Sequence, residues 1–267
     1  MRRLPAVAGR FYPAGRLALE SDLKEFISAK EEKRKALGAI APHAGYMYSG
    51  AVAGEVYASL EIPEDILLLG PNHTGMGPDL SIFAEGEWEV PNGVLEINSE
   101  LARILINEIP FMEKDETAHL YEHSLEVQLP FIAYLNPGAR IIPVVIGRAG
   151  LATLKEAGLG LAMAVKSYKK EVLIITSSDM SHYEPDELAR KKDGKAIEKI
   201  LALDPEGLYN VVRSERISMC GIMPAVMMLY ALKELGGKEA RLVKYATSAE
   251  VSGDFSQVVG YAGIVIA

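Results

Sequence analysis

Short apolar runs alternate along the chain with longer amphipathic segments. Several of these runs are apolar at consecutive positions, which is typical of strands in a sheet that is covered on both faces. The pattern therefore predicts a central sheet buried between two other layers. The predicted strands span residues 36–42, 66–70, 141–146, 172–176, 241–246 and 258–266.

The segments between the predicted strands carry apolar residues at three- and four-residue spacing, as helices with one buried face do. Strands that alternate with such helices predict an α/β protein, a three-layer α/β/α sandwich around a mixed central sheet. Because no repeat or low-complexity linker interrupts the pattern, we expect a single domain over residues 1–267. The predicted helices span residues 49–60, 98–109, 150–170 and 221–237.

Residues 81–98 follow a different pattern, in which apolar and polar positions alternate one by one. The alternation surrounds the turn signal Pro91-Asn92-Gly93, and such a signal between two alternating runs is typical of a β-hairpin. The sequence therefore predicts a hairpin appended to the main sheet.

Composition and charge exclude several classes of function. The chain has 28 basic and 36 acidic residues and a net charge of −8, so we expect no nucleic-acid partner. No apolar stretch approaches the roughly 18 residues needed to cross a bilayer, and the N-terminal region lacks the apolar core of a signal peptide. A single cysteine agrees with a reducing compartment, and we expect a cytoplasmic protein without a membrane contact.

Polar and titratable residues follow three of the predicted strands. His43 follows the first, Asn72 and His73 follow the second, and Asp179 and His182 follow the fourth. In open α/β sheets, ligand sites gather at the carboxyl ends of the strands. We therefore expect these side chains to converge on one cleft.

Cys220 stands at or just before the start of the predicted helix at residues 221–237. The amides and dipole of a helix start favour a thiolate. Two imidazoles and a thiolate suit iron, copper or zinc, whereas magnesium and calcium prefer oxygen ligands. The sequence thus predicts a transition-metal site at His43, His73 and Cys220, although such histidines also satisfy loop carbonyls and such cysteines also serve as packing residues.

Other candidate residues have two interpretations each. Asp179 and His182 suit an orienting carboxylate and a general base, or supports for the metal ligands, and Asp179 also suits a helix N-cap. His123 and Glu126 share one face if their segment is helical, and would then line the same pocket. His119 is expected at the surface or a hairpin edge, without a functional role.

Six motifs, in this order, resemble those of the Memo family, and the resemblance covers nearly the whole chain. The family is similar in fold to the class III extradiol dioxygenases, nonhaem iron enzymes that hold a metal in a cleft at the strand ends of an α/β sandwich. The resemblance implies the same fold here. The motifs are AGRFYP, APHAGYMYSG, GPNHTG, EHSLEVQLPF, SSDMSHY and MCGIMPAVMML.

The resemblance implies that His43, His73 and Cys220 are metal ligands and that Asp179 and His182 line the same pocket. We expect Tyr48 and Asn72, which belong to the first two of the histidine motifs, to line it as well. In the dioxygenases a carboxylate stands in the place of the cysteine. A thiolate donates more strongly and can itself be oxidised, so this departure argues against simple transfer of ring cleavage.

Two functions remain open. The first is a metal-dependent oxidoreductase that uses iron or copper on a small aromatic molecule or a reactive oxygen species, with His182 moving protons and Asp179 orienting it. The second is a cleft without turnover that binds a metal, a peptide or a small molecule. The resemblance also implies AMMECR-domain and radical-SAM proteins as partners.

Overall fold

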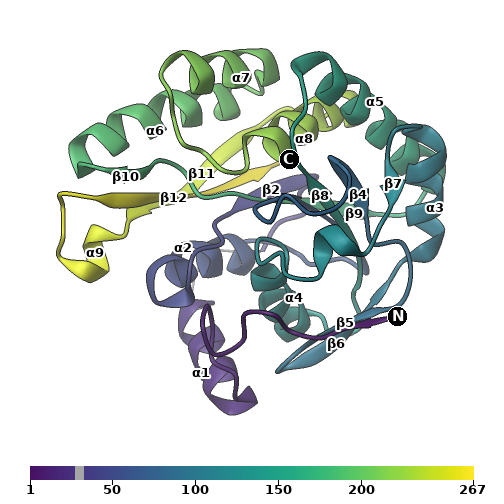
Figure 1. Cartoon of the computed structure of the whole chain (residues 1–267), viewed down its shortest axis with the longest axis horizontal. Coiled ribbons are helices and arrows are strands. Elements are labelled where there is room, and N and C mark those ends of the chain that lie inside the picture. Colours follow the sequence, from purple (N-terminus) through teal and green to yellow (C-terminus); the bar gives the residue numbers. More distant parts are fainter. Residues whose placement is uncertain (28–32) are drawn as a thin grey trace.

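The computed structural model describes residues 1–27 and 33–267 (Figure 1). It is the predicted three-layer α/β/α sandwich around a mixed central sheet. Four parallel strands lie side by side in the middle of the sheet, and a long strand pairs antiparallel with the last of them. In spatial order they are β8 (Arg140–Ile146), β3 (Asp65–Pro71), β9 (Val172–Ser177), β2 (Gly38–Ala41) and β12 (Val258–Ile266).

Shorter strands extend the sheet at both edges. On the β8 side, the predicted hairpin is present, since β5 and β6 pair antiparallel with Val90 opposite Gly93, and β6 joins β8. On the β12 side, two further strands pair with β12 itself. The edge strands are β1 (Arg2–Arg3), β4 (Leu80–Ile82), β5 (Glu87–Val90), β6 (Gly93–Ile97), β7 (Glu113–Lys114), β10 (His182–Glu184) and β11 (Ala240–Thr247).

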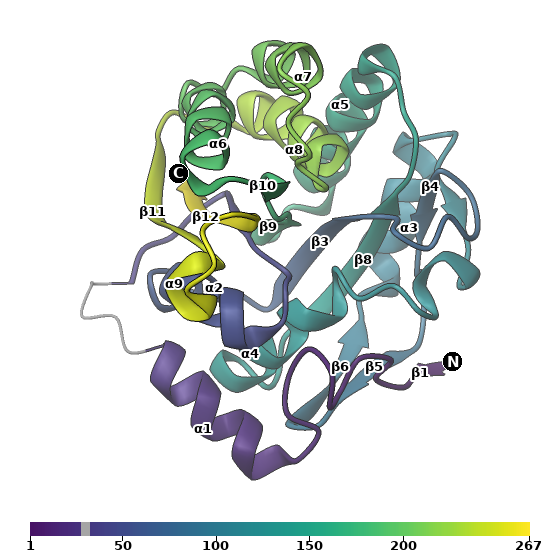
Figure 2. The same ribbon diagram turned by 60° about the vertical axis from the view of Figure 1, so that its left-hand side comes forward.

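Helices cover both faces of the sheet (Figures 1 and 2). One face packs against α3 (Ser99–Glu108), α5 (Leu151–Tyr168), α6 (Asp186–Leu201), α7 (Pro205–Ser214) and α8 (Ile222–Leu235). The opposite face packs against α1 (Arg16–Phe26), α2 (Tyr46–Ala58) and α4 (Leu129–Leu135). The short elements are the 3₁₀ helices η1 (Thr117–His119) and η2 (Glu126–Gln128) and the helix α9 (Ala249–Ser252).

Strand β3 shows why the central runs are apolar at consecutive positions. Leu67 and Leu69 point to the layer that contains α5 and α8, whereas Ile66 and Leu68 point to the layer that contains α2 and α4. All four side chains are fully buried. Because successive side chains of a strand point to opposite faces, a sheet covered twice needs apolar residues at every position.

The six predicted strands and four predicted helices are all present, with ends that differ by at most three residues. The four central parallel strands end at one edge of the sheet, at Ala41, Pro71, Ile146 and Ser177. The loops that follow them therefore converge there. Among the described residues, no helix combines the length and the apolar character that crossing a membrane requires.

Candidate metal centre

Three histidines meet at the carboxyl ends of the central strands. His43 follows β2, His73 follows β3, and His123 lies in the loop between η1 and η2. The ring centroids are 5.1 Å apart for His43 and His73, 5.4 Å for His43 and His123, and 4.6 Å for His73 and His123. One ring nitrogen from each lies within 4.8 Å of the other two, so the group could hold a metal ion.

Cys220 joins this group from the other side of the sheet edge. Its Sγ lies 3.2 Å from Nε2 of His43, and the amide of Asp179 donates to the same sulfur at 3.1 Å. Cys220 stands two residues before α8, which begins at Ile222. The structure thus brings together His43 and His73, which the sequence predicted as ligands, adds His123 to them, and places the third predicted ligand, Cys220, against His43.

The surroundings of His43 determine which ring nitrogen faces the cleft. Oγ of Ser177 donates to the carbonyl of Ser124 at 2.6 Å and accepts from Nε2 of Gln128 at 2.8 Å. Since a hydroxyl has one proton, Ser177 can only accept from Nδ1 of His43, which lies 2.8 Å away. The Nε2 of His43 is therefore unprotonated and directed at Cys220, as a metal ligand requires.

Glu122 holds His73 in the same way. Its Oε1 accepts from Nδ1 of His73 at 2.9 Å and from the amide of Ser124 at 2.8 Å, while its Oε2 accepts from the amide of His73 at 2.6 Å. Burial opposes ionisation of Glu122, but His73 and the Ser124 amide outweigh it and lower the pKa to about 2. The carboxylate is ionised, so Nε2 of His73 is free to bind a metal.

Two histidines of the cluster, His43 and His123, are neutral. Burial lowers the pKa of His43 well below its ordinary value, and the neighbouring histidines add to the effect. Burial also lowers the pKa of His123 to about 4, against the attraction of Glu122, whose Oε1 lies 3.4 Å from Nδ1 of His123. Neutral imidazole is the form that binds metals.

Asp179 supports the cluster through its carboxylate and its amide. Oδ1 accepts from the backbone amide of His43 at 2.8 Å, and burial raises the pKa of this carboxyl to about 6. Asp179 lies in the loop between β9 and β10, so it is no helix N-cap. The expected thiolate is also wrong for the metal-free chain, because burial, followed by the charge of Asp179, raises the pKa of the Cys220 thiol.

His182 lies on β10, at the rim of this group. Its amide donates to Oγ of Ser218 at 2.7 Å, and its Nδ1 lies 2.9 Å from the carbonyl oxygen of Ser218. A carbonyl only accepts, so Nδ1 carries the proton and Nε2 is left as a proton acceptor. A charge on His182 would lower the pKa of both His43 and Asp179.

Three other predicted residues lie outside the cluster. The helix expected to pair His123 with Glu126 does not form, and the Glu126 carboxylate bonds to the N-terminal segment instead. Tyr48 lies in the first turn of α2, 39% exposed. His119 is fully buried between Phe83 and Trp88, so its expected surface position is wrong.

A cleft of about 790 Å³ opens from the cluster to solvent, with His73, Cys220 and Arg148 in its walls. The predicted residue Asn72 lines the cleft and shapes its loop, since Oδ1 accepts from the hydroxyl of Thr74 and the amide of Gly75. Sequence reasoning missed Glu122 and Arg148. Glu122 stands next to His123 in the sequence, and Arg148 comes two residues after β8 ends at Ile146, so both positions could have been chosen as candidates.

The fold and this cluster together define an α/β/α protein with a candidate metal centre at the strand ends. The family model described as Memo-like protein matches residues 3–265, and the chain belongs to the Memo family. It is 41% identical to a MEMO1 family protein of Methanopyrus kandleri and 45% identical to those of Methanosarcina barkeri and Aquifex aeolicus. Each alignment covers at least 98% of both chains.

The fold also occurs in a protein of very different sequence. The crystal structure of an uncharacterized protein from Escherichia coli K12 aligns with a TM-score of 0.57 at 12% identity. The alignment covers 86% of this chain and 100% of that chain. At this identity the likeness concerns the fold alone.

Proposed function

We propose that the cleft holds a redox transition metal, iron or copper, and that the protein is a metal-dependent oxidoreductase. One observation carries the proposal: ring nitrogens of His43, His73 and His123 converge within 4.8 Å, and the thiol of Cys220 lies against Nε2 of His43. Imidazoles with a thiolate suit iron, copper and zinc. The metal would hold Cys220 as a thiolate, since cations strongly favour the deprotonated ligand.

The residues around the candidate metal ligands support a catalytic role better than a role in binding metal alone. A bound redox metal would supply electron transfer or activation of dioxygen, for a substrate such as a small aromatic molecule. In its neutral form, His182 donates its Nδ1 proton to the carbonyl of Ser218, which leaves Nε2 to accept a proton from the substrate in the proposed reaction. Asp179 fixes the loop of His43 through Oδ1 and the loop of Cys220 through its amide.

The metal site is tested by metal content after anaerobic reconstitution with ferrous iron or cuprous copper. We expect one metal per chain in the wild type, and an affinity at least about tenfold lower in His73→Ala and in Cys220→Ser. His119→Phe removes a histidine outside the cluster and should bind metal as the wild type does. A wild type that retains neither metal contradicts the proposal.

The roles of His123 and Cys220 are separated by cobalt substitution. A thiolate ligand gives cobalt(II) a strong charge-transfer absorption, which we expect in the wild type and in His123→Gln but not in Cys220→Ser. Turnover is tested by oxygen consumption in wild type and His182→Gln, with catechol as the small aromatic substrate that supplies the electrons. This variant should keep its metal and lose oxygen consumption, whereas a protein that only binds metal would consume no oxygen in either form.

A further inference from the structure

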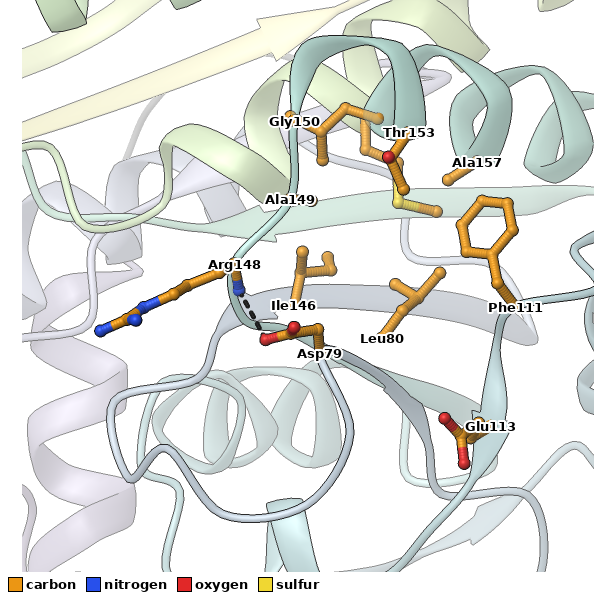
Figure 3. A pocket seen from close by; sticks show the side chains of 12 residues that line it. Asp79, Leu80, Phe111, Glu113, Ile146, Arg148, Ala149, Gly150, Thr153 and Ala157 are labelled. Carbon is orange, nitrogen blue, oxygen red and sulfur yellow. Dashed lines mark hydrogen bonds between the residues drawn. The ribbon is translucent and has the colours of Figure 1, made fainter.

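A second cavity lies beside the cleft, at the ends of β4 and β8 and under the first turns of α5 (Figure 3). Its volume is about 320 Å³, within the range of small-molecule sites. Asp79, Ile146 and Arg148 line both this cavity and the cleft, so the two spaces share a wall. The amides of Gly147 and Arg148 donate to Asp79 at 2.6 and 2.9 Å and fix that wall in place.

The body of the cavity is lined mainly by apolar side chains, with the carboxylate of Glu113 and the hydroxyl of Thr153 at its margin. Leu80 and Ile146 form its floor, Ala157 and other residues of α5 cover it, and the ring of Phe111 closes one end (Figure 3). The thioether of Met227 completes the lining. The apolar walls between these polar groups suit an aromatic ring or a branched aliphatic group.

Two charged residues of the shared wall, Asp79 and Arg148, line the cleft, and Oδ1 of Asp79 already accepts from the backbone amide of Arg148. The Arg148 side chain leaves the wall and points away from Phe111 and Ala157 (Figure 3). It lines the cleft together with His73 and Cys220, and among residues 1–27 and 33–267 no carboxylate pairs with its guanidinium. A planar guanidinium in this position favours a carboxylate on a ligand.

We propose that the cavity is the substrate-recognition pocket of the cleft, and that it binds the apolar end of a small carboxylic acid whose carboxylate pairs with Arg148. The inference rests on the proposed function for its link to turnover. The apolar group would lie among Leu80, Phe111 and Ala157, and the carboxylate would lie beyond Asp79, on the side of His73 and Cys220. Binding itself needs no metal.

The binding step is tested on metal-free protein with phenylacetate, phenylpropionate and phenylbutyrate as probes. The reporter is the ¹³C-labelled methyl resonance of Met227, assigned by loss of its signal in Met227→Leu. We expect at least one probe to shift this resonance in a saturable way. In Arg148→Gln the same probe should bind at least about tenfold more weakly, a loss of about 1.4 kcal/mol. The variant should bind the probe no better than it binds the alcohol analogue of the probe.

Filling the cavity should abolish probe binding. Ala157→Leu places a larger side chain in the apolar body, and Thr153→Leu does so from the exposed rim, where the risk to folding is small. Ala152→Leu adds the same side chain to a neighbouring exposed position outside the cavity and is the control. We expect at least about a tenfold loss in both filling variants and none in the control. No probe binding to the wild type, or equal binding in Thr153→Leu, overturns the proposal.

The link to the cleft is tested with metal-loaded protein that consumes oxygen. The bound probe should inhibit the wild type and the Ala152→Leu control but not Thr153→Leu. Equal inhibition of all three would overturn the assignment as a substrate pocket. If no form consumes oxygen, the proposed function fails, while probe binding to metal-free protein still decides on the cavity.

Discussion

Two glutamates four residues apart hold different parts of the molecule together. Glu122 and Glu126 are both fully buried, and both use the two oxygens of their carboxylates. Glu122 binds the loop of His73 and so belongs to the candidate metal centre. Glu126 binds the N-terminal segment and so belongs to the scaffold.

The partners of Glu126 explain why it serves as a structural anchor. Its carboxylate pairs with Arg3 at 2.7 Å and accepts from the amides of Ala6 and Val7 and from the hydroxyl of Tyr12. These partners all belong to one segment, residues 3–12. The comparison shows that residue type and burial do not assign a role, whereas the segments that a buried charge connects do.

Arg3 joins the two regions. Its guanidinium bonds to the side chain of Glu126 and, at 2.8 Å, to the backbone carbonyl of Glu122. It also lies 4.2 Å above the ring of Trp88 and donates to the carbonyl of His119. The N-terminal segment thus supports the loop that carries Glu122, although it contributes no ligand.

The largest expected effect is on the scaffold. Glu126→Ala should lower the free energy of unfolding by about 3–5 kcal/mol, because it leaves Arg3 charged, buried and without its partner. Urea denaturation of metal-free protein measures the change. The double variant Arg3→Met with Glu126→Leu removes both charges and should lose clearly less stability. A loss below about 1 kcal/mol in Glu126→Ala would contradict the anchor.

The second effect is on the metal centre. Glu122→Gln replaces a carboxylate by a neutral amide, which holds and polarises His73 less well. We expect metal affinity to fall by about 10–100-fold, while metal-free protein loses less stability than Glu126→Ala does. Competition with a chelator measures the affinity, and Glu116→Gln in the same loop region is the control. Unchanged affinity in Glu122→Gln would show that the two glutamates do not differ in the way proposed.

The sequence predicted the sheet well because each central strand is marked by a pattern within its own few residues. Central strands such as β3 are apolar at every position, and that pattern follows directly from burial on both faces. Helix α6 was missed because its segment is rich in charged residues and buries few apolar ones, among them Ala196 and Ile200. Its fully buried Asp193, which accepts from Tyr245, further weakens the apolar pattern.

The site was predictable in part for a related reason. His43 and His73 each come two residues after a central strand ends, so the fold class alone placed them at one sheet edge. His123 lies in an irregular loop, where no periodicity indicates which way a side chain points. The pairing of Arg3 with Glu126 spans 123 positions, and no pattern among neighbouring residues predicts a contact at that sequence separation.

The third effect is on the pH dependence of the free energy of unfolding. It distinguishes His119, which lies in the scaffold, from the histidines of the metal centre. Burial, and then the charge of Arg3, lowers the pKa of His119 to about 3. Between pH 6.5 and 3 the unfolded chain binds a proton there that the folded chain does not, so stability falls as the pH falls. His119→Phe removes this loss, which is about 2 kcal/mol at pH 5.

Urea denaturation of metal-free wild type and His119→Phe at pH 7.5 and 5 measures this difference. His43 and His123 also have lowered pKa values, but both proteins contain them, so their contribution cancels. The wild type should lose more stability than the variant on acidification. Equal losses would mean that His119 is protonated in the folded protein, and hence that its apolar surroundings do not exclude the charge.

The smallest effect is expected at Ser177, which holds His43 as Glu122 holds His73. Ser177→Ala removes a neutral hydrogen bond to Nδ1, worth about 1 kcal/mol, so metal affinity should fall about fivefold. Thr176→Val removes a neighbouring buried hydroxyl that contacts Met228 on the other face of the sheet, and should leave the affinity unchanged. A charged acceptor orients a ligand more firmly than a neutral one, so Ser177→Ala must cost less than Glu122→Gln. The reverse order would mean that His43, with its serine, is the dominant ligand and that Glu122 serves the scaffold as Glu126 does.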